Sequence, residues 1–169
     1  MNSSSDKMNQ ANTEPFTDEF IPLSEEHEIW LLLGQVSDGM MKARDNELRP
    51  YGLSSVQVGV LYAVTEAGGS LTGIEISRRL VRRPASVYKL LERMEKQKLV
   101  ECIRNTEGKK EVRVQLTDKG KDLYRNHSRQ VIPKILGKLS TREREQFKET
   151  LKKLRTRVYE ELAEQPVYP

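Results

Sequence analysis

A dense set of basic side chains lies between Val81 and Thr117, around a thin apolar stripe. Residues 72–116 carry twelve lysines and arginines against six acidic residues, whereas residues 1–50 carry four against ten. Lysine and arginine neutralise phosphates, and polar side chains in the first turns of a helix can reach base edges in a DNA groove. A basic centre behind an acidic start therefore indicates a polyanionic partner for this part of the chain.

The apolar residues of this stretch have the spacing of a helix followed by a hairpin. Pro84 is a favoured first helical residue, because its missing amide hydrogen has no intrahelical partner there. The stripe that would face a core consists of Val87, Leu90, Leu91 and Met94. After Leu99 the apolar period changes to two, and Gly108 lies between the two alternating runs. We therefore predict a helix from Pro84 and a β-hairpin with a basic tip.

Further helices are predicted on both sides of this unit. Capping boxes at Ser54, Thr72 and Ser140 indicate three helix starts, because a hydroxyl caps one amide and the residue three positions on reaches back. The predicted helices cover residues 24–48, 55–66, 73–80, 118–137 with a kink near Pro133, and 141–163. Apolar residues of the last one recur every three or four positions, which suits packing against another helix.

Helix, helix, helix and hairpin in this order is the winged helix-turn-helix arrangement. The predicted fold class is mainly α with a small β-hairpin (α+β), in a single domain over residues 23–165. Within it, residues 52–117 are predicted to form the winged-helix lobe, and residues 24–48 and 118–163 to form long N- and C-terminal helices, which the family resemblance described next assigns to dimerisation. Residues 1–22 are rich in Ser, Asn, Glu and Pro and are predicted to be a flexible arm.

Three stretches resemble the successive signatures of the MarR family of transcriptional regulators: GLSSVQVGVLYAV, LTGIEISRRLVRRPASVYKLLERMEKQKLVECI and VRVQLTDKG. The resemblance implies a homodimer, assembled from the first helix and the last two. It also implies binding to a pseudo-palindromic operator and, often, a response to a small ligand. The chain departs from the family at Gly108 and Lys110, which usually are Asp and Arg. It also departs at Lys98, where glycine is common, and at Arg83, where a small hydroxyl residue usually caps the recognition helix.

Nine residues are the candidates for DNA contact. Ser86, Tyr88 and Lys89 lie in the first turns of the recognition helix and are predicted to touch base edges. The others are predicted to hold phosphates or, for Arg104, to enter the minor groove from the base of the wing. These others are Arg82, Arg83, Arg93, Arg104, Lys109 and Lys110. For each residue the alternative is a solvated surface side chain without a DNA contact.

The resemblance also implies an effector pocket between the dimer helices and the lobe. Its candidate residues supply aromatic walls, one polarisable methionine side chain and a cation for an anionic aromatic or phenolic ligand. These candidates are His27, Trp30, Met40, Arg44 and Tyr62. The alternative places Trp30 and Met40 in a dimer core and Arg44 on the surface.

The single cysteine and the two separated histidines argue against a disulfide and against a metal site. Cys102 alone forms neither an intramolecular disulfide nor a multi-cysteine metal site, and is predicted to be a half-buried strand residue. His27 and His127 are far apart in the sequence, and helical surface positions are predicted for both. No catalytic or phosphate-loop motif occurs, so no enzyme activity, cofactor or metal is expected.

The sequence thus predicts a homodimeric, DNA-binding transcriptional regulator, a repressor released from its operator by a small effector. A cytoplasmic location is expected, because no secretory signal and no apolar run of roughly 20 residues occurs. Two alternatives stay open. One is a DNA-binding module without a ligand, and the other is a winged helix whose basic face docks an acidic protein partner.

Overall fold

The computed structural model describes residues 24–104 and 112–164. The predicted arm, residues 1–22, and the wing tip with Lys109 and Lys110 lie outside the described residues. By internal contacts the chain divides into residues 1–35 and 36–169, and α1 begins in the first part and ends in the second. The single domain over residues 23–165 stays a prediction.

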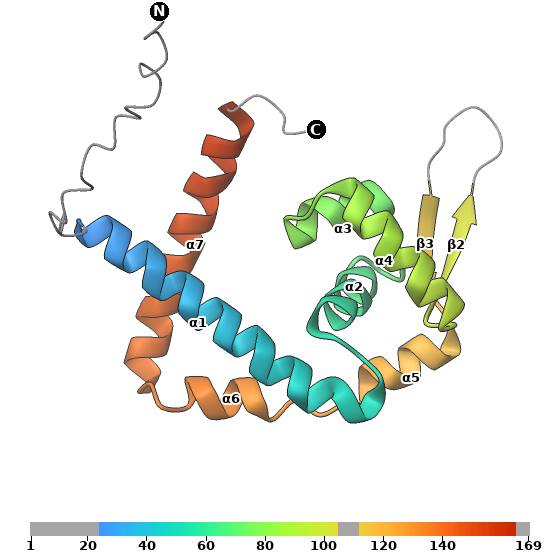
Figure 1. The fold of residues 1–169 in the computed structure, drawn as a ribbon, viewed down its shortest axis with the longest axis horizontal. Helices are drawn as coiled ribbons and strands as arrows, with labels where there is room; N and C mark the ends of the chain where they lie inside the picture. The colour runs from blue at the N-terminus through green and yellow to red at the C-terminus, as the bar shows by residue number, and fades with distance from the viewer. Residues whose placement is uncertain (1–23, 105–111, 165–169) are drawn as a thin grey trace, which may run out of the picture. The chain divides into compact units, whose positions relative to one another are not determined.

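The elements follow the predicted order, and the mainly α fold with a small sheet is confirmed (Figure 1). In sequence they are α1 Glu25–Leu48, the short 3-10 helix η1 Arg49–Tyr51, α2 Ser55–Glu66, β1 Ser70–Thr72, α3 Gly73–Leu80, α4 Pro84–Lys96, β2 Val100–Arg104, β3 Val112–Leu116, α5 Asp118–Asn126, α6 Val131–Leu136 and α7 Thr141–Glu164.

Side-chain caps explain three of the helix starts. Ser54 caps α2 and Thr72 caps α3, each in a reciprocal capping box with the residue three positions later. Ser140 caps α7 in the same way: its amide donates to Glu143 at 2.7 Å, and its hydroxyl accepts the Glu143 amide at 3.3 Å. The three capping boxes predicted from the sequence are therefore confirmed.

The sheet has three antiparallel strands in the order β1-β3-β2, so it contains the predicted hairpin and one strand that was not predicted. The hairpin itself is β2-β3, paired from Val100 opposite Leu116 to Arg104 opposite Val112. Strand β1 pairs with the other edge of β3, with Leu71 opposite Val114. Three residues are too few to show an alternating pattern, which is why the sequence did not reveal β1.

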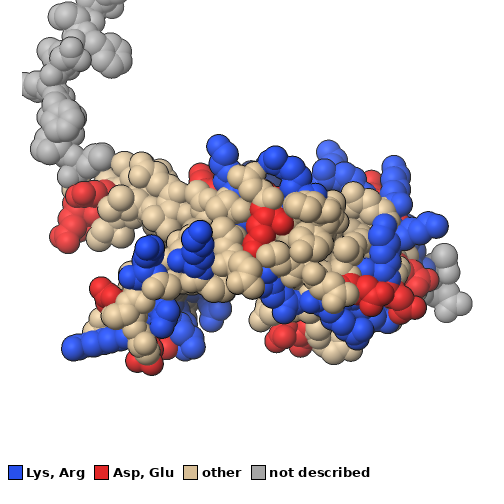
Figure 2. All heavy atoms as spheres, turned by 90° about the horizontal axis from the view of Figure 1, so that it is seen from below, with Lys and Arg blue, Asp and Glu red and all other residues tan. Residues whose placement is uncertain are grey.

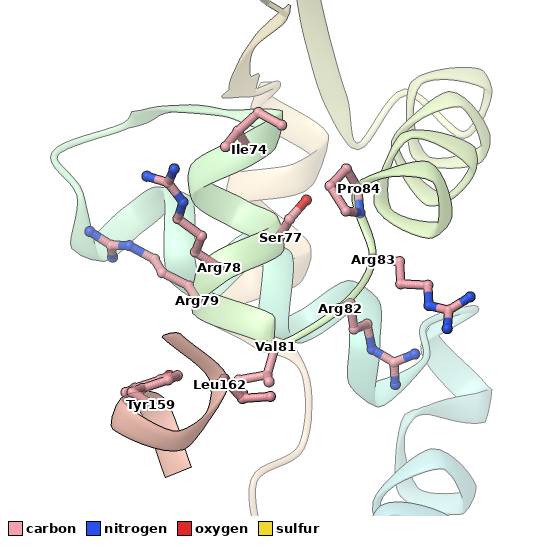
Figure 3. Close-up of a pocket in the computed structure, with 10 residues that line it drawn as sticks. All are labelled: Ile74, Ser77, Arg78, Arg79, Val81, Arg82, Arg83, Pro84, Tyr159 and Leu162. Carbon is pink, nitrogen blue, oxygen red and sulfur yellow. The ribbon is translucent and has the colours of Figure 1, made fainter. Parts of the chain in front are cut away.

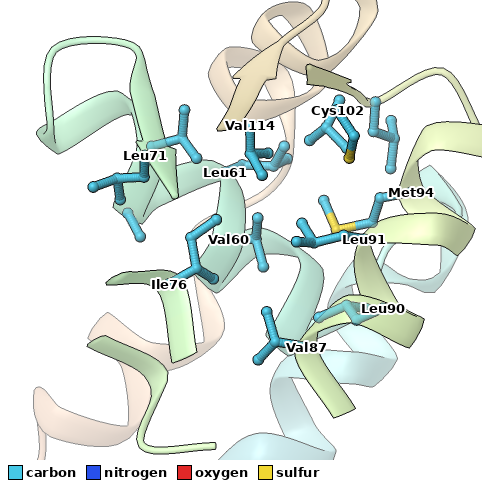
Figure 4. Packing of buried hydrophobic residues seen from close by; sticks show 14 of the residues in the cluster. Val60, Leu61, Leu71, Ile76, Val87, Leu90, Leu91, Met94, Cys102 and Val114 are labelled. Carbon is cyan, nitrogen blue, oxygen red and sulfur yellow. The ribbon is translucent and has the colours of Figure 1, made fainter. Parts of the chain in front are cut away.

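The hydrophobic core of the lobe lies between α2, α3, α4 and the sheet (Figure 4). The predicted stripe of α4 is confirmed, because Val87, Leu90, Leu91 and Met94 are all buried. They pack in one cluster with side chains of α2, α3 and the strands. Burying such a side chain contributes about 1.5–3 kcal/mol. This packing fixes α4 to the lobe by one face and leaves its other face exposed.

The predicted helix over residues 118–137 is wrong, because α5 ends at Asn126 and α6 begins at Val131. Pro133 does not kink a helix. It lies in the first turn of α6, where an amide hydrogen has no intrahelical partner. His127 at the end of α5 is buried and not on the surface as predicted, and its Nδ1 lies 2.9 Å from the carbonyl oxygen of Leu123.

Glu47 of α1 stabilises the break between α5 and α6. Its Oε1 accepts the amides of Gln130 at 2.6 Å and Val131 at 3.1 Å, and also the hydroxyl of Ser128. Its other oxygen pairs with Arg44, which also donates to the Ser128 carbonyl. Burial alone would raise the pKa of Glu47, but these hydrogen bonds outweigh it and lower the pKa from 4.5 to about 2. The end of α1 thus holds the start of α6.

Replacing Glu47 with glutamine is expected to lower the free energy of unfolding at pH 7 by about 2 kcal/mol, because four partly or fully exposed donors lose a charged acceptor. The folded-state pKa is depressed, so the stabilisation is complete above pH 4.5 and is lost as the pH falls toward 2. Urea unfolding of both proteins at pH 7 and near pH 2.5 measures this. Glu66→Gln, on an exposed side chain, is the matched control. An equal difference at both pH values would contradict the assignment.

Candidate nucleic-acid interface

The exposed face of α4 and its start carry five of the predicted DNA contacts. Their side chains lie on the opposite face from the buried stripe or just before the first turn. The five exposed residues are Arg82, Arg83, Ser86, Lys89 and Arg93. Arg83 occupies the N-cap of α4 and makes no side-chain cap, as the departure from the family predicted. The guanidinium of Arg83 is therefore not used to close the helix end.

Tyr88 lies differently from the prediction, because it is partly buried against the core. A Cβ atom placed on Gly73 would lie 2.6 Å from Cε1 of the Tyr88 ring, so the ring is packed against the start of α3. Tyr88 thus braces α4 on α3. Its proposed base contact stays a prediction.

The turn between α3 and α4 depends on a left-handed residue, Val81, with φ of 51°. The amide of Val81 donates to Arg78, and the amide of Arg82 donates to Ser77 at 3.0 Å. This is the Schellman pattern that commonly ends a helix with glycine. A β-branched residue in this conformation is strained. The strained turn sets the angle at which α4 leaves α3.

Four arginines surround this turn, of which Arg78 and Arg79 were not among the predicted DNA contacts. They line a pocket of about 790 Å³ that also includes Val81, Tyr159 and Leu162. Figure 3 shows the guanidinium groups of Arg78 and Arg79 on one side and those of Arg82 and Arg83 on the other. None of the ion pairs found in residues 24–104 and 112–164 involves these four side chains. The turn therefore carries an excess of positive charge, and the basic excess of residues 72–116 was the signal for Arg78 and Arg79.

The base of the wing is tied to α4 by Glu95. Arg104, predicted to enter the minor groove, has its Nη2 atom 3.0 Å from Oε2 of Glu95. The other oxygen of Glu95 accepts the amide of Cys102 at 3.1 Å. Cys102 is buried, and burial, together with the charge of Glu95, raises the pKa of its thiol. The thiol is therefore not activated as a nucleophile.

The passage from α4 into the wing uses a second left-handed residue, Lys98, with φ of 58°. Its amide donates to Glu95, and the amide of Leu99 donates to Met94, again the Schellman pattern. Glycine is the usual residue for this geometry, which explains the family preference at this position. Here the backbone of Lys98 is modestly strained, and its basic side chain lies beside the recognition helix.

The sequence of this lobe matches a known protein family. Residues 51–111 match the model of the MarR family, and the matched segment corresponds to the lobe that contains α2 to β2. The resemblance of the lobe to the MarR family is therefore confirmed. The likeness is to transcriptional regulators. No curated protein sequence matches the chain.

Solved structures of regulators extend the MarR likeness beyond the lobe. The organohalide-sensing transcriptional regulator RdhR in its 2,4-dichlorophenol-bound form is 28% identical, with a TM-score of 0.74 over 89% of both chains. Its ligand-free form is 26% identical, with a TM-score of 0.78 over 96% of this chain and 99% of that one. MepR of S. aureus in complex with DNA is 25% identical, with a TM-score of 0.67 over 77% of this chain and 97% of that one.

The effector candidates implied by the MarR resemblance lie in different surroundings. His27 and Trp30, in residues 24–35, are exposed, and His27 pairs with Ser24. In the second part of the chain, Arg44 is engaged by Glu47, and Tyr62 is exposed on α2. Met40 lines a groove of about 450 Å³ with residues of α6 and α7. Their joint role in a pocket stays a prediction.

Two kinds of feature are absent from the described residues. In residues 24–104 and 112–164, no group of three or more His, Cys, Asp or Glu side chains is arranged to hold a metal ion. None of the helices in the same ranges is both long and apolar enough to cross a membrane.

Proposed function

We propose that this chain is a repressor that binds a pseudo-palindromic operator as a homodimer and is released by a small aromatic or phenolic effector. The observation that carries the proposal is the two-sided character of α4. One face is anchored in the core by Val87, Leu90, Leu91 and Met94, while the other presents exposed basic and hydroxyl side chains. A helix held in this way fits the major groove of DNA.

The positive charge around α4 supports contact with the DNA backbone. The four arginines at the α3–α4 turn make no ion pair among the described residues, and Arg113 on β3 is also exposed. Figure 2, seen from below the view of Figure 1, shows more Lys and Arg than Asp and Glu side chains on the surface that faces the viewer. Phosphate contacts position a protein on the duplex, whereas base contacts select the sequence. We assign Arg82 and Arg83 to phosphates, and Ser86 and Lys89 to base edges.

The apolar faces of the long helices support the homodimer. In the single chain, α7 exposes a continuous apolar strip, with 37–50% of each side chain accessible. This strip consists of Phe147, Leu151, Leu154, Val158, Tyr159 and Leu162. In α1, Ile29, Trp30, Leu32 and Val36 are more than half exposed. Exposed apolar surface on this scale marks an interaction site. A second copy of the same chain would cover it and place two recognition helices about one DNA turn apart.

Release by an effector follows from the geometry of two linked helices. A ligand that prefers a dimer with the wrong helix separation weakens operator binding, by no more than its differential affinity for the two shapes. The 28% identical regulator RdhR, solved with 2,4-dichlorophenol, favours a phenolic ligand class. We place the regulator in the cytoplasm, together with its operator.

A gel-shift assay tests the proposal directly. Duplexes that tile the DNA upstream of the coding region are mixed with the protein, with and without a panel of phenols and aromatic acids. The proposal predicts one preferred duplex and its release by at least one compound. If no compound releases the duplex, the chain is a DNA-binding module without a ligand, and the effector part of the proposal is wrong.

Two substitutions separate the roles of the basic residues. Lys89→Ala is expected to lose about 1–3 kcal/mol of preference for the operator over random duplex, because Lys89 contacts a base. Arg82→Ala is expected to weaken binding to both duplexes alike and to reduce the salt slope by about 0.9, because Arg82 holds a phosphate. Fluorescence anisotropy over a series of salt concentrations measures both effects. Identical behaviour of the two variants would overturn this assignment of roles.

A further inference from the structure

Glu95 lies in the last turn of α4 and bonds two groups of strand β2 at once. Its Oε1 atom accepts the amide of Cys102 at 3.1 Å, and its Oε2 atom accepts Nη2 of Arg104 at 3.0 Å. Strand β2 is an edge of the sheet, because β3 lies between it and β1. The outward amides of an edge strand have no strand partner. A single carboxylate therefore ties the recognition helix to the outer edge of the wing.

The bond to Glu95 holds Arg104 in place but leaves most of the N–H donors of Arg104 free for another partner. The Arg104 side chain is 61% exposed, and Arg104 is the last described residue of β2 before the wing tip. A guanidinium has five N–H donors in a rigid plane, and the contact with Glu95 leaves most of them free. Since the carboxylate fixes the orientation of that plane, the free donors face a defined direction.

The charges of the two residues support this arrangement. Burial alone would raise the pKa of Glu95, but the hydrogen bonds from Arg104 and the Cys102 amide, with the charge of Arg104, outweigh it and lower the pKa. The hydrogen bond and charge of Glu95 in turn raise the pKa of Arg104. Glu95 is therefore ionised throughout the physiological pH range.

The sequence shows why such a bond matters in this chain. At the wing tip, Gly108 and Lys110 stand where the MarR family usually has Asp and Arg. An acid–base pair between those two positions is therefore impossible here. Glu95 and Arg104 supply an acid–base pair at the base of the wing instead, between α4 and β2.

We propose that Glu95 is a positioning residue for DNA binding, which presents Arg104 to the minor groove beside the wing and couples the wing to the recognition helix. The inference rests on the proposed function, because Arg104 meets the minor groove only when α4 occupies the adjacent major groove. Glu95 itself does not touch the duplex. Its effect on binding passes through Arg104.

The sign of one substitution tests the proposal. Glu95→Gln removes a negative charge near the phosphates, which by electrostatics alone would strengthen DNA binding. The proposal predicts instead that affinity for the tightest-binding upstream duplex falls roughly 3- to 10-fold, because Arg104 is no longer oriented. Arg104→Ala should weaken binding by a similar factor and reduce the salt slope by about 0.9. In the Arg104→Ala background, Glu95→Gln should cause no further loss.

Glu92→Gln is the matched control, since Glu92 is an exposed acid on the same helix and makes no ion pair among the described residues. It should bind the duplex as tightly as the wild type or more tightly. Thermal unfolding of each variant shows whether the fold is intact, and a half-exposed pair should affect it little. Should Glu95→Gln fail to fold, Arg104→Lys replaces it. This variant keeps the charge and the salt slope but is expected to lose affinity, because lysine lacks the planar fork.

The outcomes separate this inference from the proposed function. A wild-type protein that binds no duplex overturns the proposed function, and the inference with it. A wild type that binds while Glu95→Gln binds equally well overturns the inference alone. The same holds if Glu95→Gln weakens binding as much in the Arg104→Ala background as in the wild type, or if Arg104→Lys retains full affinity.

Discussion

Replacing Leu151 with glutamate is expected to convert the proposed homodimer to monomers and to lower operator affinity roughly 100-fold. Leu151 lies in the middle of the apolar strip of α7, with Phe147 and Leu154 one turn away on either side. A charge at this position would be buried without a partner in any helix–helix interface. A monomer also loses the second half-site, whose linkage to the first strengthens binding by about 100-fold or more. Size-exclusion chromatography with light scattering measures the first effect, and anisotropy measures the second.

Thr156→Glu is the control for this prediction. It introduces the same charge on the same helix, on the exposed face opposite the apolar strip. It should leave the dimer and its operator affinity unchanged. An unchanged dimer in the Leu151→Glu protein would show that α7 is not the interface and would remove the main support for the homodimer.

Gly120→Ala is expected to lower the free energy of unfolding by about 3 kcal/mol, because the added methyl group has no room beside the backbone of Leu99. A Cβ atom at this position would lie 2.0 Å from the carbonyl oxygen of Leu99, which is backbone and cannot rotate away. That carbonyl also accepts the amide of Thr117, the cap of α5. The added methyl group would therefore push α5 away from the start of the wing.

Urea or thermal unfolding measures this loss, and Gly34→Ala supplies the comparison. Gly34 lies inside α1, and a Cβ atom there meets nothing within 4 Å. Alanine favours a helix over glycine by about 1 kcal/mol, so this variant should be as stable as the wild type or more so. A Gly120→Ala protein of wild-type stability would show that α5 does not approach Leu99 as closely as described.

Local signals in the sequence predicted the elements that position the interface. Four helix starts are marked by the hydroxyl caps Ser54, Thr72 and Ser140 and by Pro84. Apolar residues at helical spacing follow each of them, so the two signals predict the same helices. The buried stripe of α4 followed from its spacing alone. The exposed basic face followed from the same spacing, because side chains that do not face the core must face solvent or a partner.

Interactions between distant residues were beyond the reach of these local signals. The break between α5 and α6 depends on Glu47, more than 80 positions earlier, and no helical period reports such a cap. The bond between Glu95 and Arg104 likewise depends on how β2 lies against α4. The partial burial of Tyr88 depends on the absence of a side chain at Gly73. Each of these is a consequence of packing, and packing is not encoded in any one segment.

Hydroxyl-radical footprinting of the upstream DNA tests the central claim most directly. The claim is that two α4 helices of a homodimer occupy successive major grooves of one specific site. It predicts two protected half-sites with centres about 10–10.5 base pairs apart, at a protein concentration that leaves random duplex unprotected in about 150 mM salt. A single protected patch, or equal protection of specific and random DNA at that salt concentration, would contradict it.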